Sequence, residues 1–360
     1  MLIATLKNTK AKNVDLQEYF AKNSLQIDPL EYFDITGKNG WFLGSKAEFK
    51  LKQKIEQNGK PLKDWDVKIN YGIKTGLNEA FIIDENKKNE LIAKDPKSAE
   101  IIKPILRGRD IKRYGYEFAN LYVINTHNGC VEETPSLHNG KQGLSSTKIP
   151  PININDYPAI KEHLDSFEPA LSKRSDKGVT PYNLRNCAYL DEFEKEKVVW
   201  GQFQDGSEYS LSPKGFTLSS NEYMLCGDYN RKFFLGLLNS KIVTYYLSMV
   251  SNSLGESSNI FQKSIFETIP IPTLNTPEKQ QIAGQIELLV EELLAVKNLP
   301  LTKGSNSQSL GVNNIEPQSA TQTAPLKGAM DTTSLEAKID ELIFELYGLT
   351  SEEIGVILGF

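Results

Sequence analysis

Cysteine and histidine are scarce in this chain of 360 residues, which has three of each. No Cys-x-x-Cys or His-x-x-x-His pair is present, so a structural zinc site, which needs closely spaced ligands, is not expected. An odd number of scattered thiols fits a reducing compartment better than a disulfide framework. We therefore predict neither a metal site nor a disulfide from Cys130, Cys187, Cys226, His127, His138 and His163.

Long apolar runs are absent as well. No stretch approaches the ~18 uninterrupted apolar residues of a membrane span, and the apolar run at the N-terminus is too short for a signal peptide. We expect a soluble, cytoplasmic protein without a membrane contact. The 39% of hydrophobic residues can still form a sizeable core. At the usual ~150 residues per domain, the length suits about two domains.

Known catalytic signatures are missing too. There is no Gly-x-Gly-x-x-Gly and no Gly-x-x-x-x-Gly-Lys-Ser/Thr, so neither a dinucleotide nor an ATP phosphate cradle is expected. Asn-Pro-Pro-Tyr and Asp-Pro-Pro-Tyr, with which amino-methyltransferases hold an extruded base, are also absent. The Pro-Pro pair at 150–151 is flanked by Ile149 and Ile152, which cannot do this. We predict no catalytic residue and no cofactor in this chain.

Charge is unevenly distributed along the chain, whose net charge is −5. Residues 68–115 contain eleven Lys and Arg against seven Asp and Glu, whereas residues 276–360 contain five against twelve. The potential at a groove depends on nearby charges, so a basic segment in an acidic chain can bind a polyanion. The net charge therefore does not exclude nucleic-acid binding.

The apolar pattern predicts a mixed α/β fold, with a β-rich domain that contains a long buried helix and is followed by C-terminal helices. A helix is expected at 46–62, and an apolar run with recurrences every three or four residues predicts the buried helix at 233–250. Short aromatic and β-branched runs predict strands at 80–84, 121–125, 197–203 and 222–226.

Composition divides the chain into five segments. Residues 1–69 open with LIATL, a strand candidate, and form an N-terminal remnant or interface segment; residues 70–275 form the β-rich domain. Thr276 and Pro277 suit the start of a spacer helix over 276–299. Residues 300–331, rich in Ser, Gln, Asn, Gly and Pro, predict a flexible linker, and 332–360 a helical hairpin.

The C-terminal helices carry local signals of their own. Capping boxes predict helix starts at Thr333-x-x-Glu336 and Thr350-x-x-Glu353. The spacer helix has a coiled-coil seam of two heptads, which is marginal in water without a partner, so helix–helix self-association is one possibility. The seam consists of Ile282, Ile286, Leu289, Leu293 and Val296.

A glycine-bracketed loop is the first candidate for binding DNA. Gly72 and Gly76 enclose Lys74 and Thr75. Glycine allows the backbone to approach another chain closely, and the Lys and Thr side chains offer donors to phosphate oxygens. We predict phosphate contacts from Lys74, Thr75 and Gly76.

A cationic cluster at 103–113 is the second candidate. Its one acid is Asp110, and Gly108 is expected to form a turn that sends the arginines in different directions. Arginine suits bidentate contact with guanine edges or phosphates. The alternative is a solvated loop whose arginines pair with Asp110 and Glu117. The cluster consists of Lys103, Arg107, Arg109, Lys112 and Arg113.

Other basic and aromatic residues admit two interpretations each. Lys173 and Arg174 form either a second basic contact or a charged helix end, and the stretch before Lys263 is either a loop at a phosphate or a plain linker. Three aromatic residues could stack on an extruded base, although a Trp within KVVWGQF is more typical of a core. These are Trp200, Tyr182 and Phe203.

Several separated phrases resemble one known family, in the right order over roughly 70–275. They are similar to the TaqI-like C-terminal specificity domain, the target-recognition domain of type IIG restriction-modification enzymes and adenine-specific DNA methyltransferases. The ending IDELIFELYGLTSEEI also looks like the tail that follows such domains. The phrases are GIKTGLNEAFIID, IIKPILRGRDIKRY, YVINTHNG, FLGLLNSKIVTYY, Gly255…Phe261-Gln262-Lys263 and the exit IPIP.

The resemblance implies a module that docks on duplex DNA, reads a short sequence from the major groove and helps a neighbouring methyltransferase domain extrude an adenine. It favours the functional interpretation of the cationic cluster. Lysines would then set the register on phosphates, and Arg107, Arg109 or Arg113 would read bases.

The chain departs from the family pattern because only residues 1–69 precede the domain, where a methyltransferase domain normally stands. We therefore expect either a separate specificity subunit or the C-terminal part of a split N6-adenine DNA methyltransferase. S-adenosylmethionine and Mg²⁺ are expected for the catalytic partner, a methyltransferase or endonuclease domain or subunit. A third possibility is an interaction scaffold formed by the C-terminal helices.

Overall fold

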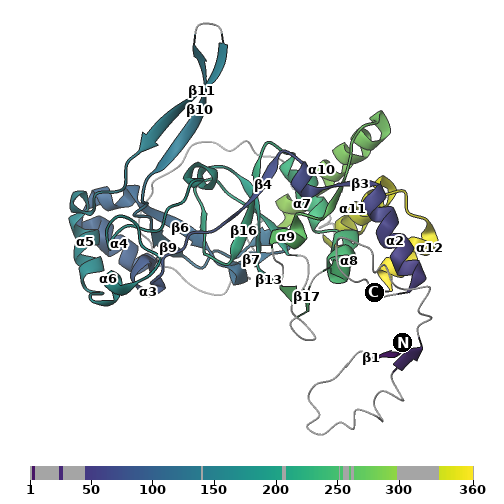
Figure 1. Ribbon diagram of the computed structural model, residues 1–360, viewed down its shortest axis with the longest axis horizontal. Helices are drawn as coiled ribbons and strands as arrows, with labels where there is room; N and C mark the ends of the chain where they lie inside the picture. Colours follow the sequence, from purple (N-terminus) through teal and green to yellow (C-terminus); the bar gives the residue numbers. More distant parts are fainter. Residues whose placement is uncertain are drawn as a thin grey trace, which may run out of the picture.

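A computed structural model describes most of the chain and shows an elongated arrangement with a central sheet between an α/β end and a helical end (Figure 1). The fold class predicted from the sequence, a mixed α/β domain followed by C-terminal helices, is confirmed. The described residues are 2–4, 24–26, 45–138, 141–204, 208–250, 252–253, 259–260, 263–297 and 332–359.

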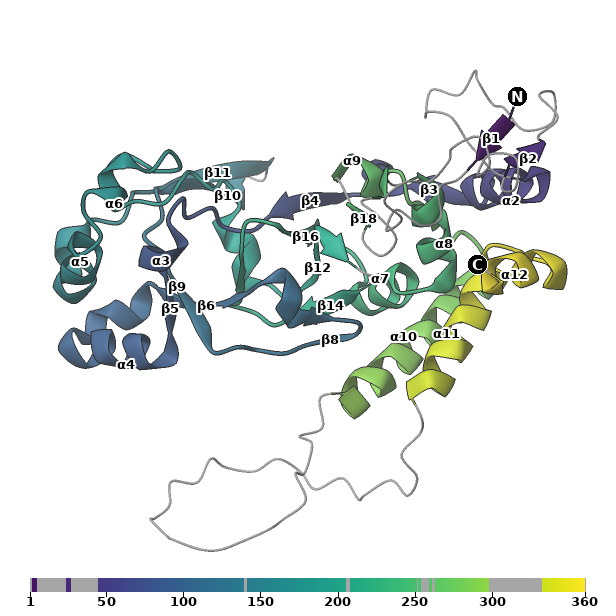
Figure 2. The same cartoon turned by 90° about the horizontal axis from the view of Figure 1, so that it is seen from below.

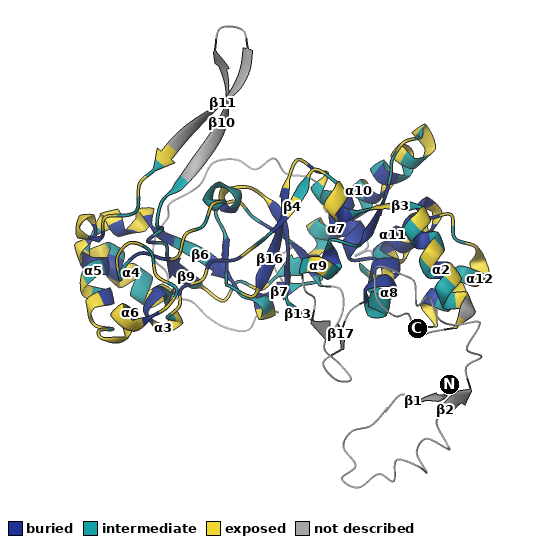
Figure 3. Cartoon of the chain, in the orientation of Figure 1, coloured by how far each residue is buried: buried dark blue, intermediate teal, exposed yellow. Residues whose placement is uncertain are grey.

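The central sheet has four antiparallel strands in the order β14-β12-β16-β4. Side chains alternate across it: Val198 and Trp200 enter one hydrophobic cluster, and Val199 enters the other. Both faces of the sheet are therefore buried, as the dark blue strands in Figure 3 show. The strands are β4 (Val67–Tyr71), β12 (Lys197–Gly201), β14 (Tyr209–Ser212) and β16 (Glu222–Gly227).

The α/β end is built on a second sheet, β15-β6-β9-β5, in which only β15 and β6 are parallel. Its strands are β5 (Ile82–Asp84), β6 (Ile102–Leu106), β9 (Leu121–Ile124) and β15 (Thr217–Leu218). Its helices are α3 (Asn78–Phe81), α4 (Glu85–Lys94), α5 (Pro158–Asp165) and α6 (Ala170–Lys173).

Short 3-10 turns and small strand pairs complete the structure. The hairpin of β10 (Cys130–His138) and β11 (Lys141–Ile149) projects from the body in Figure 1. The turns are η1 (Leu62–Asp64), η2 (Pro96–Glu100), η3 (Gly108–Asp110), η4 (Ile154–Asp156) and η5 (Leu190–Glu194). The other strands are β1 (Leu2–Ala4), β2 (Ser24–Gln26), β7 (Ile111–Lys112), β8 (Gly115–Tyr116), β13 (Phe203–Gln204), β17 (Asn252–Ser253) and β18 (Asn259–Ile260).

The helical end combines segments from both ends of the chain. Strand β3 (Gly59–Pro61) pairs with β19 (Pro270–Pro272), so the residues around α2 join the C-terminal helices. β4 continues across the predicted segment boundary at 69/70, which places both segments in one sheet. The helices are α2 (Lys46–Gln57), α7 (Arg231–Leu238), α8 (Lys241–Val250), α9 (Lys263–Phe266), α10 (Pro277–Lys297), α11 (Thr332–Leu346) and α12 (Ser351–Leu358).

The buried apolar run at 233–250 forms two helices, α7 and α8, where one was predicted, and they are bent by 61°. The side chain of Asn239 bonds the backbone of Tyr209, and the carboxylate of Asp340 accepts from the Lys241 N–H at 2.8 Å. These polar groups compete with helical hydrogen bonds at the break. Among the described residues no single helix is long and apolar enough to span a membrane; the bent pair has this length and composition only together, and most of its residues are buried.

Helix α10 finds partners within the chain, because it packs against α7 and lies beside α11 (Figure 2). Its buried residues are Ala283, Ile286, Val290 and Leu293, so the predicted seam is correct at Ile286 and Leu293 and shifted elsewhere. Self-association of this helix stays a prediction. The predicted linker at 300–331 lies outside the described residues.

Local signals were confirmed unevenly. Thr276 accepts from the Lys279 N–H, and the capping box at Thr350 is present. The helix predicted to start at Thr333 is α11, which begins one residue earlier at Thr332, and the side chain of Glu336 pairs with Arg113. The strands predicted at 121–125 and 222–226 correspond to β9 and β16, whereas 80–84 divides between α3 and β5, and 197–203 between β12 and β13.

Candidate nucleic-acid interface

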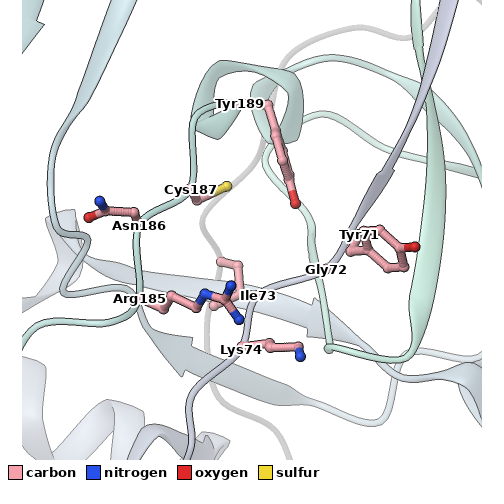
Figure 4. Close-up of a pocket in the computed structure, with 8 residues that line it drawn as sticks. All are labelled: Tyr71, Gly72, Ile73, Lys74, Arg185, Asn186, Cys187 and Tyr189. Carbon is pink, nitrogen blue, oxygen red and sulfur yellow. The ribbon is translucent and has the colours of Figure 1, made fainter. Parts of the chain in front are cut away.

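Two hollows meet at Tyr71. The first, the Tyr189 hollow, holds about 280 Å³ (Figure 4) and is lined by Tyr71, Gly72, Ile73, Lys74, Arg185, Asn186, Cys187 and Tyr189. The second, the Lys263 hollow, holds about 630 Å³ and is lined by Tyr71, Gln202, Tyr223, Lys263, Ser264 and Glu267. We call this combined surface the Tyr71 face.

Tyr71 is the last residue of β4, which is the edge strand of the central sheet. It lies opposite Tyr223 in the strand register, with the two ring centroids 5.0 Å apart. The side chain nevertheless remains 41% exposed, unlike most large hydrophobic residues of the chain. Tyr71 therefore presents part of an aromatic ring to solvent, supported from behind by a buried one.

The loop after β4 presents Lys74 and buries Thr75. The Gly72 N–H donates to the Glu222 carbonyl, and a Cβ at Gly72 would lie only 1.8 Å from the Ser219 carbonyl oxygen. The close approach predicted for this glycine is thus made to the chain itself. Thr75 is 3% exposed and its hydroxyl bonds the side chain of Asn78, so the prediction that Thr75 contacts phosphate is wrong.

Gly76 has a different reason for being glycine. Its φ is +68°, and a Cβ there would contact Asp176 at 3.0 Å. Gly76 thus shapes the exit of the loop next to Asp176. Of the three predicted loop residues, Lys74 alone offers an exposed charged donor, and no carboxylate of the described residues lies within ion-pair distance of it.

The wall opposite Lys74 comes from residues 185–189, far away in the sequence. Arg185 has a side chain that is 57% exposed and lies 3.3 Å from the carboxylate of Asp176. In Figure 4, Arg185 and Lys74 lie toward one end of the Tyr189 hollow and Tyr189 toward the other. Burial raises the pKa of Tyr189 to about 12 and that of Cys187 to about 11, so both groups are neutral near pH 7. The charge of this lining is therefore positive.

Lys263 supplies the cation of the second hollow. It is half-buried at the first position of α9, and its ammonium group lies 3.7 Å from Glu267, the residue that directly follows this helix. Pairs of this kind at a surface are weak, typically 0–1 kcal/mol. A phosphate could therefore compete with Glu267 for Lys263.

Glu222 connects the Tyr71 face with the predicted basic cluster. Its buried carboxylate accepts from the Gly108 N–H at 2.7 Å and from the Ser219 hydroxyl, while its backbone carbonyl accepts from Gly72. Burial raises the pKa of Glu222, against the lowering effect of these hydrogen bonds. One carboxylate thus holds the turn at 108–110 next to the end of β4.

The basic cluster itself is largely paired within the protein. Arg107 donates to both oxygens of Asp110, at 2.8 and 2.7 Å, and this pair closes turn η3. Burial acts to raise the pKa of Asp110, but the hydrogen bonds from Arg107 outweigh it and the pKa is lowered. The alternative of pairing with Asp110 is therefore correct for Arg107, whose Nε and one terminal nitrogen are engaged by that carboxylate.

Arg113 has a structural role as well. Its Nε lies 2.5 Å from a carboxylate oxygen of Glu336, and Lys297 lies 3.5 Å from the other oxygen of the same group. Lys297 also donates to the Arg113 carbonyl at 2.9 Å. The base-reading role predicted for Arg113 is thus corrected, because its guanidinium joins the β7–β8 hairpin to α11 and its carbonyl joins the hairpin to α10.

The other three members of the cluster differ in exposure. Lys103 lies 3.5 Å from Glu194 in a hollow that also contains Glu100 and Asp191, which is an acidic setting. Arg109 is exposed and Lys112 half-buried, and within the described part of the chain neither is within ion-pair distance of a carboxylate. Arg109 and Lys112 thus remain open to an external anion.

Arg174 contradicts its prediction most clearly. It is 6% exposed, lies over the ring of Phe81 at 4.5 Å and donates to backbone carbonyls. Burial lowers its pKa to about 10, which still leaves it charged at pH 7. Arg174 is buried and bonded to backbone carbonyls of several segments, so it cannot contact DNA. The adjacent Lys173 is exposed. The carbonyls are those of Thr75, Asp176, Pro181 and Asn183.

The aromatic residues considered for base stacking lie elsewhere. Trp200 is 1% exposed and packs against Tyr223 and Phe266, so the core interpretation is correct. Tyr182 donates its hydroxyl to Asp165. The side chain of Phe203 lies outside the described residues. Among those residues no group of three or more His, Cys, Asp and Glu is placed to hold a metal ion.

Sequence reasoning missed Tyr71, Arg185 and Asn186. Arg185 has no basic residue next to it in the sequence, so it is not part of a cationic cluster that would predict a binding site. Tyr71 ends a strand whose alternation would normally send an aromatic residue inward. The sequence signal that points to this site is Lys74 in its glycine-bracketed loop. The missed residues line the same hollow as Lys74.

Residues 103–271 match the TaqI-like C-terminal specificity domain, so this part of the chain is similar to that family.

Two solved structures are similar over most of the chain. The type IIL restriction-modification enzyme MmeI, solved in complex with DNA, has a TM-score of 0.55 and 13% identity over 83% of this chain and 36% of its own. The type IIG restriction endonuclease BpuSI has a TM-score of 0.42 and 13% identity over 84% of this chain and 33% of its own. The chain thus spans about a third of the length of these enzymes, and the likeness to MmeI is one of fold.

Proposed function

We propose that the chain recognises a specific sequence of duplex DNA in a restriction-modification system, in the cytoplasm, and directs adenine methylation or cleavage by a partner catalytic domain. The observation that carries this proposal is the match of residues 103–271 to a specificity domain. The Tyr71 face supports it, because exposed cations and an exposed aromatic ring are the groups that bind a polyanion with bases.

The structure narrows the set of residues that we propose to touch DNA. Exposed or half-buried lysines would contact phosphates, and the exposed arginines Arg109 and Arg185 would read bases. Arg107, Arg113, Arg174 and Thr75 are left out because they are paired or buried. Lys103 is left out because of its acidic surroundings. The proposed phosphate contacts are Lys74, Lys112, Lys173 and Lys263.

A gel-shift series on randomised duplexes tests the proposal. Wild-type protein should select a short sequence, and Arg109→Ala should lower affinity for that sequence by about 5- to 150-fold while hardly changing affinity for unrelated DNA. Lys74→Gln should weaken binding to all sequences alike and reduce the slope of log K against log salt by about 0.9.

The matched control is Lys50→Gln, an exposed lysine on α2 in the helical end of the molecule, which should change neither quantity. Absence of any duplex binding at low salt would contradict the proposal and favour the scaffold alternative. Equal selectivity of wild type and Arg109→Ala would remove Arg109 from the set of base readers.

The identity of the partner is a separate part of the proposal. We assign S-adenosylmethionine and Mg²⁺ to the partner because this sequence has none of the motifs that hold them. An alternative is that the chain is the C-terminal part of a split N6-adenine DNA methyltransferase. The similarity to about a third of much longer enzymes favours a catalytic part on another polypeptide or segment. Methyl transfer from S-adenosylmethionine only after mixing with an Asn-Pro-Pro-Tyr polypeptide would support the alternative.

A further inference from the structure

Tyr71 lies where two cationic hollows meet. It belongs to the lining of both, with Lys74 and Arg185 on one side and Lys263 on the other. Its ring contacts the ring of Tyr223, which is 2% exposed, so a core residue fixes the position of the Tyr71 ring. In Figure 4, Gly72 lies between Tyr71 and Arg185, so the Tyr71 ring does not contact that guanidinium group.

This arrangement fits one nucleotide better than it fits a paired helix. In a duplex the base faces are covered by their neighbours, whereas an unpaired base can stack on an aromatic ring, and a ring flanked by cations is how proteins bind single strands. A base on Tyr71 would have its adjoining phosphates over the two hollows. The carboxylates nearby are already engaged, Asp176 with Arg185 at 3.3 Å and Glu267 with Lys263 at 3.7 Å.

We propose that Tyr71 holds one unpaired nucleotide of a DNA strand, with its base on the Tyr71 ring and its flanking phosphates on Lys74 on one side and on Lys263 on the other. This inference rests on the proposed function in that the nucleotide belongs to bound DNA. The two volumes, about 280 and 630 Å³, leave room for backbone groups on either side of the ring. Base–aromatic stacking tolerates any base, so the site is expected to bind without preference for sequence.

The experiment uses the full chain and three probes: a mixed-sequence duplex, the same duplex with one unpaired 2-aminopurine, and free 2-aminopurine deoxyribonucleoside monophosphate. Wild type should bind the bulged duplex about 5- to 150-fold more tightly than the paired one, the range that stacking of one base supplies. Stacking should also quench the fluorescence of the 2-aminopurine. Tyr71→Phe should retain both effects, and Tyr71→Leu should lose both the preference for the bulged duplex and the quenching.

The variants separate this inference from the proposed function. Binding of the paired duplex without a preference for the bulge contradicts the inference alone, as does a preference that persists in Tyr71→Leu. Equal affinity for the free nucleotide and the bulged duplex also overturns it. Binding of the bulged duplex without binding of the paired one contradicts the proposed function and leaves the inference standing. Tyr71→Phe serves as the folding control, and Lys50→Gln should behave as wild type in every arm.

Discussion

Two groups of basic side chains in this molecule do different things. Within residues 103–113, Arg107 and Arg113 are held by the carboxylates of Asp110 and Glu336 and fix a turn and a hairpin. On the Tyr71 face, Lys74 and Arg185 come from distant segments and stay exposed. Arg107 and Arg113, which are close in sequence, are therefore paired within the protein. Lys74 and Arg185, which are far apart in sequence, are brought together by the fold.

Burial explains why the difference matters for energy. A buried charge must be fully bonded, because an unpaired one carries a desolvation penalty of several kcal/mol. An exposed pair contributes about 0–1 kcal/mol and can exchange its partner for a ligand. We call the cations bonded within the protein internal and those exposed to solvent external. Substitution of an internal cation should lower stability, and substitution of an external one should weaken binding.

The largest effect is expected from Arg174→Gln. Four backbone carbonyls would lose a charged donor, and each buried polar group left unbonded costs about 1–3 kcal/mol, so the free energy of unfolding should fall by about 3 kcal/mol or more. Urea denaturation measures this. The neighbouring exposed Lys173→Gln should change stability by no more than about 0.5 kcal/mol. Equal stability of the two variants would break the division into internal and external cations.

A second internal cation, Lys197 on β12, should be visible in the pH dependence of stability. It is 1% exposed and donates to the carbonyls of Phe193 and Lys195, and burial lowers its pKa to about 8. Between pH 8 and the unfolded value near 10.5, the unfolded chain binds one proton more than the folded one, so stability rises with pH. At 1.36 kcal/mol per pKa unit, the rise is about 3 kcal/mol at most.

The measurement is the difference in unfolding free energy between wild type and Lys197→Met at pH 7.5 and at pH 10. The unfolding free energy of wild type should increase relative to that of the variant at the higher pH, because the variant lacks the group that titrates. Other titrating groups, such as the tyrosines, cancel between the two proteins. A difference independent of pH would show that Lys197 stays protonated in the folded state.

The division between internal and external cations also explains how far the sequence could predict this molecule. Strands such as β9 and β16 were predictable because a short apolar run between turn residues has few alternatives. The bend between α7 and α8 was not, because it depends on Asp340 from another helix capping α8. Local patterns specify elements, and distant polar groups decide where those elements break.

The candidate site follows the same rule. Lys74 was found because its glycine neighbours mark a close approach, but the partner of that approach, residues 218–222, could not be known. Arg185 and Tyr71 meet Lys74 only through the fold. Arg174 was misassigned because a sequence shows that a residue is charged and not which backbone carbonyls surround it.

The smallest effect is expected from Lys103→Gln, which sharpens the comparison within the basic cluster. The side chains of Lys103 and Glu194 are 33% and 59% exposed, with their charged atoms 3.5 Å apart, so the loss should be below about 0.5 kcal/mol. Because Glu100, Asp191 and Glu194 surround Lys103, the salt dependence of DNA binding should stay at the wild-type slope, in contrast to Lys74→Gln. A slope reduced as much as in Lys74→Gln would place Lys103 on the DNA and return this part of the cluster to the interface.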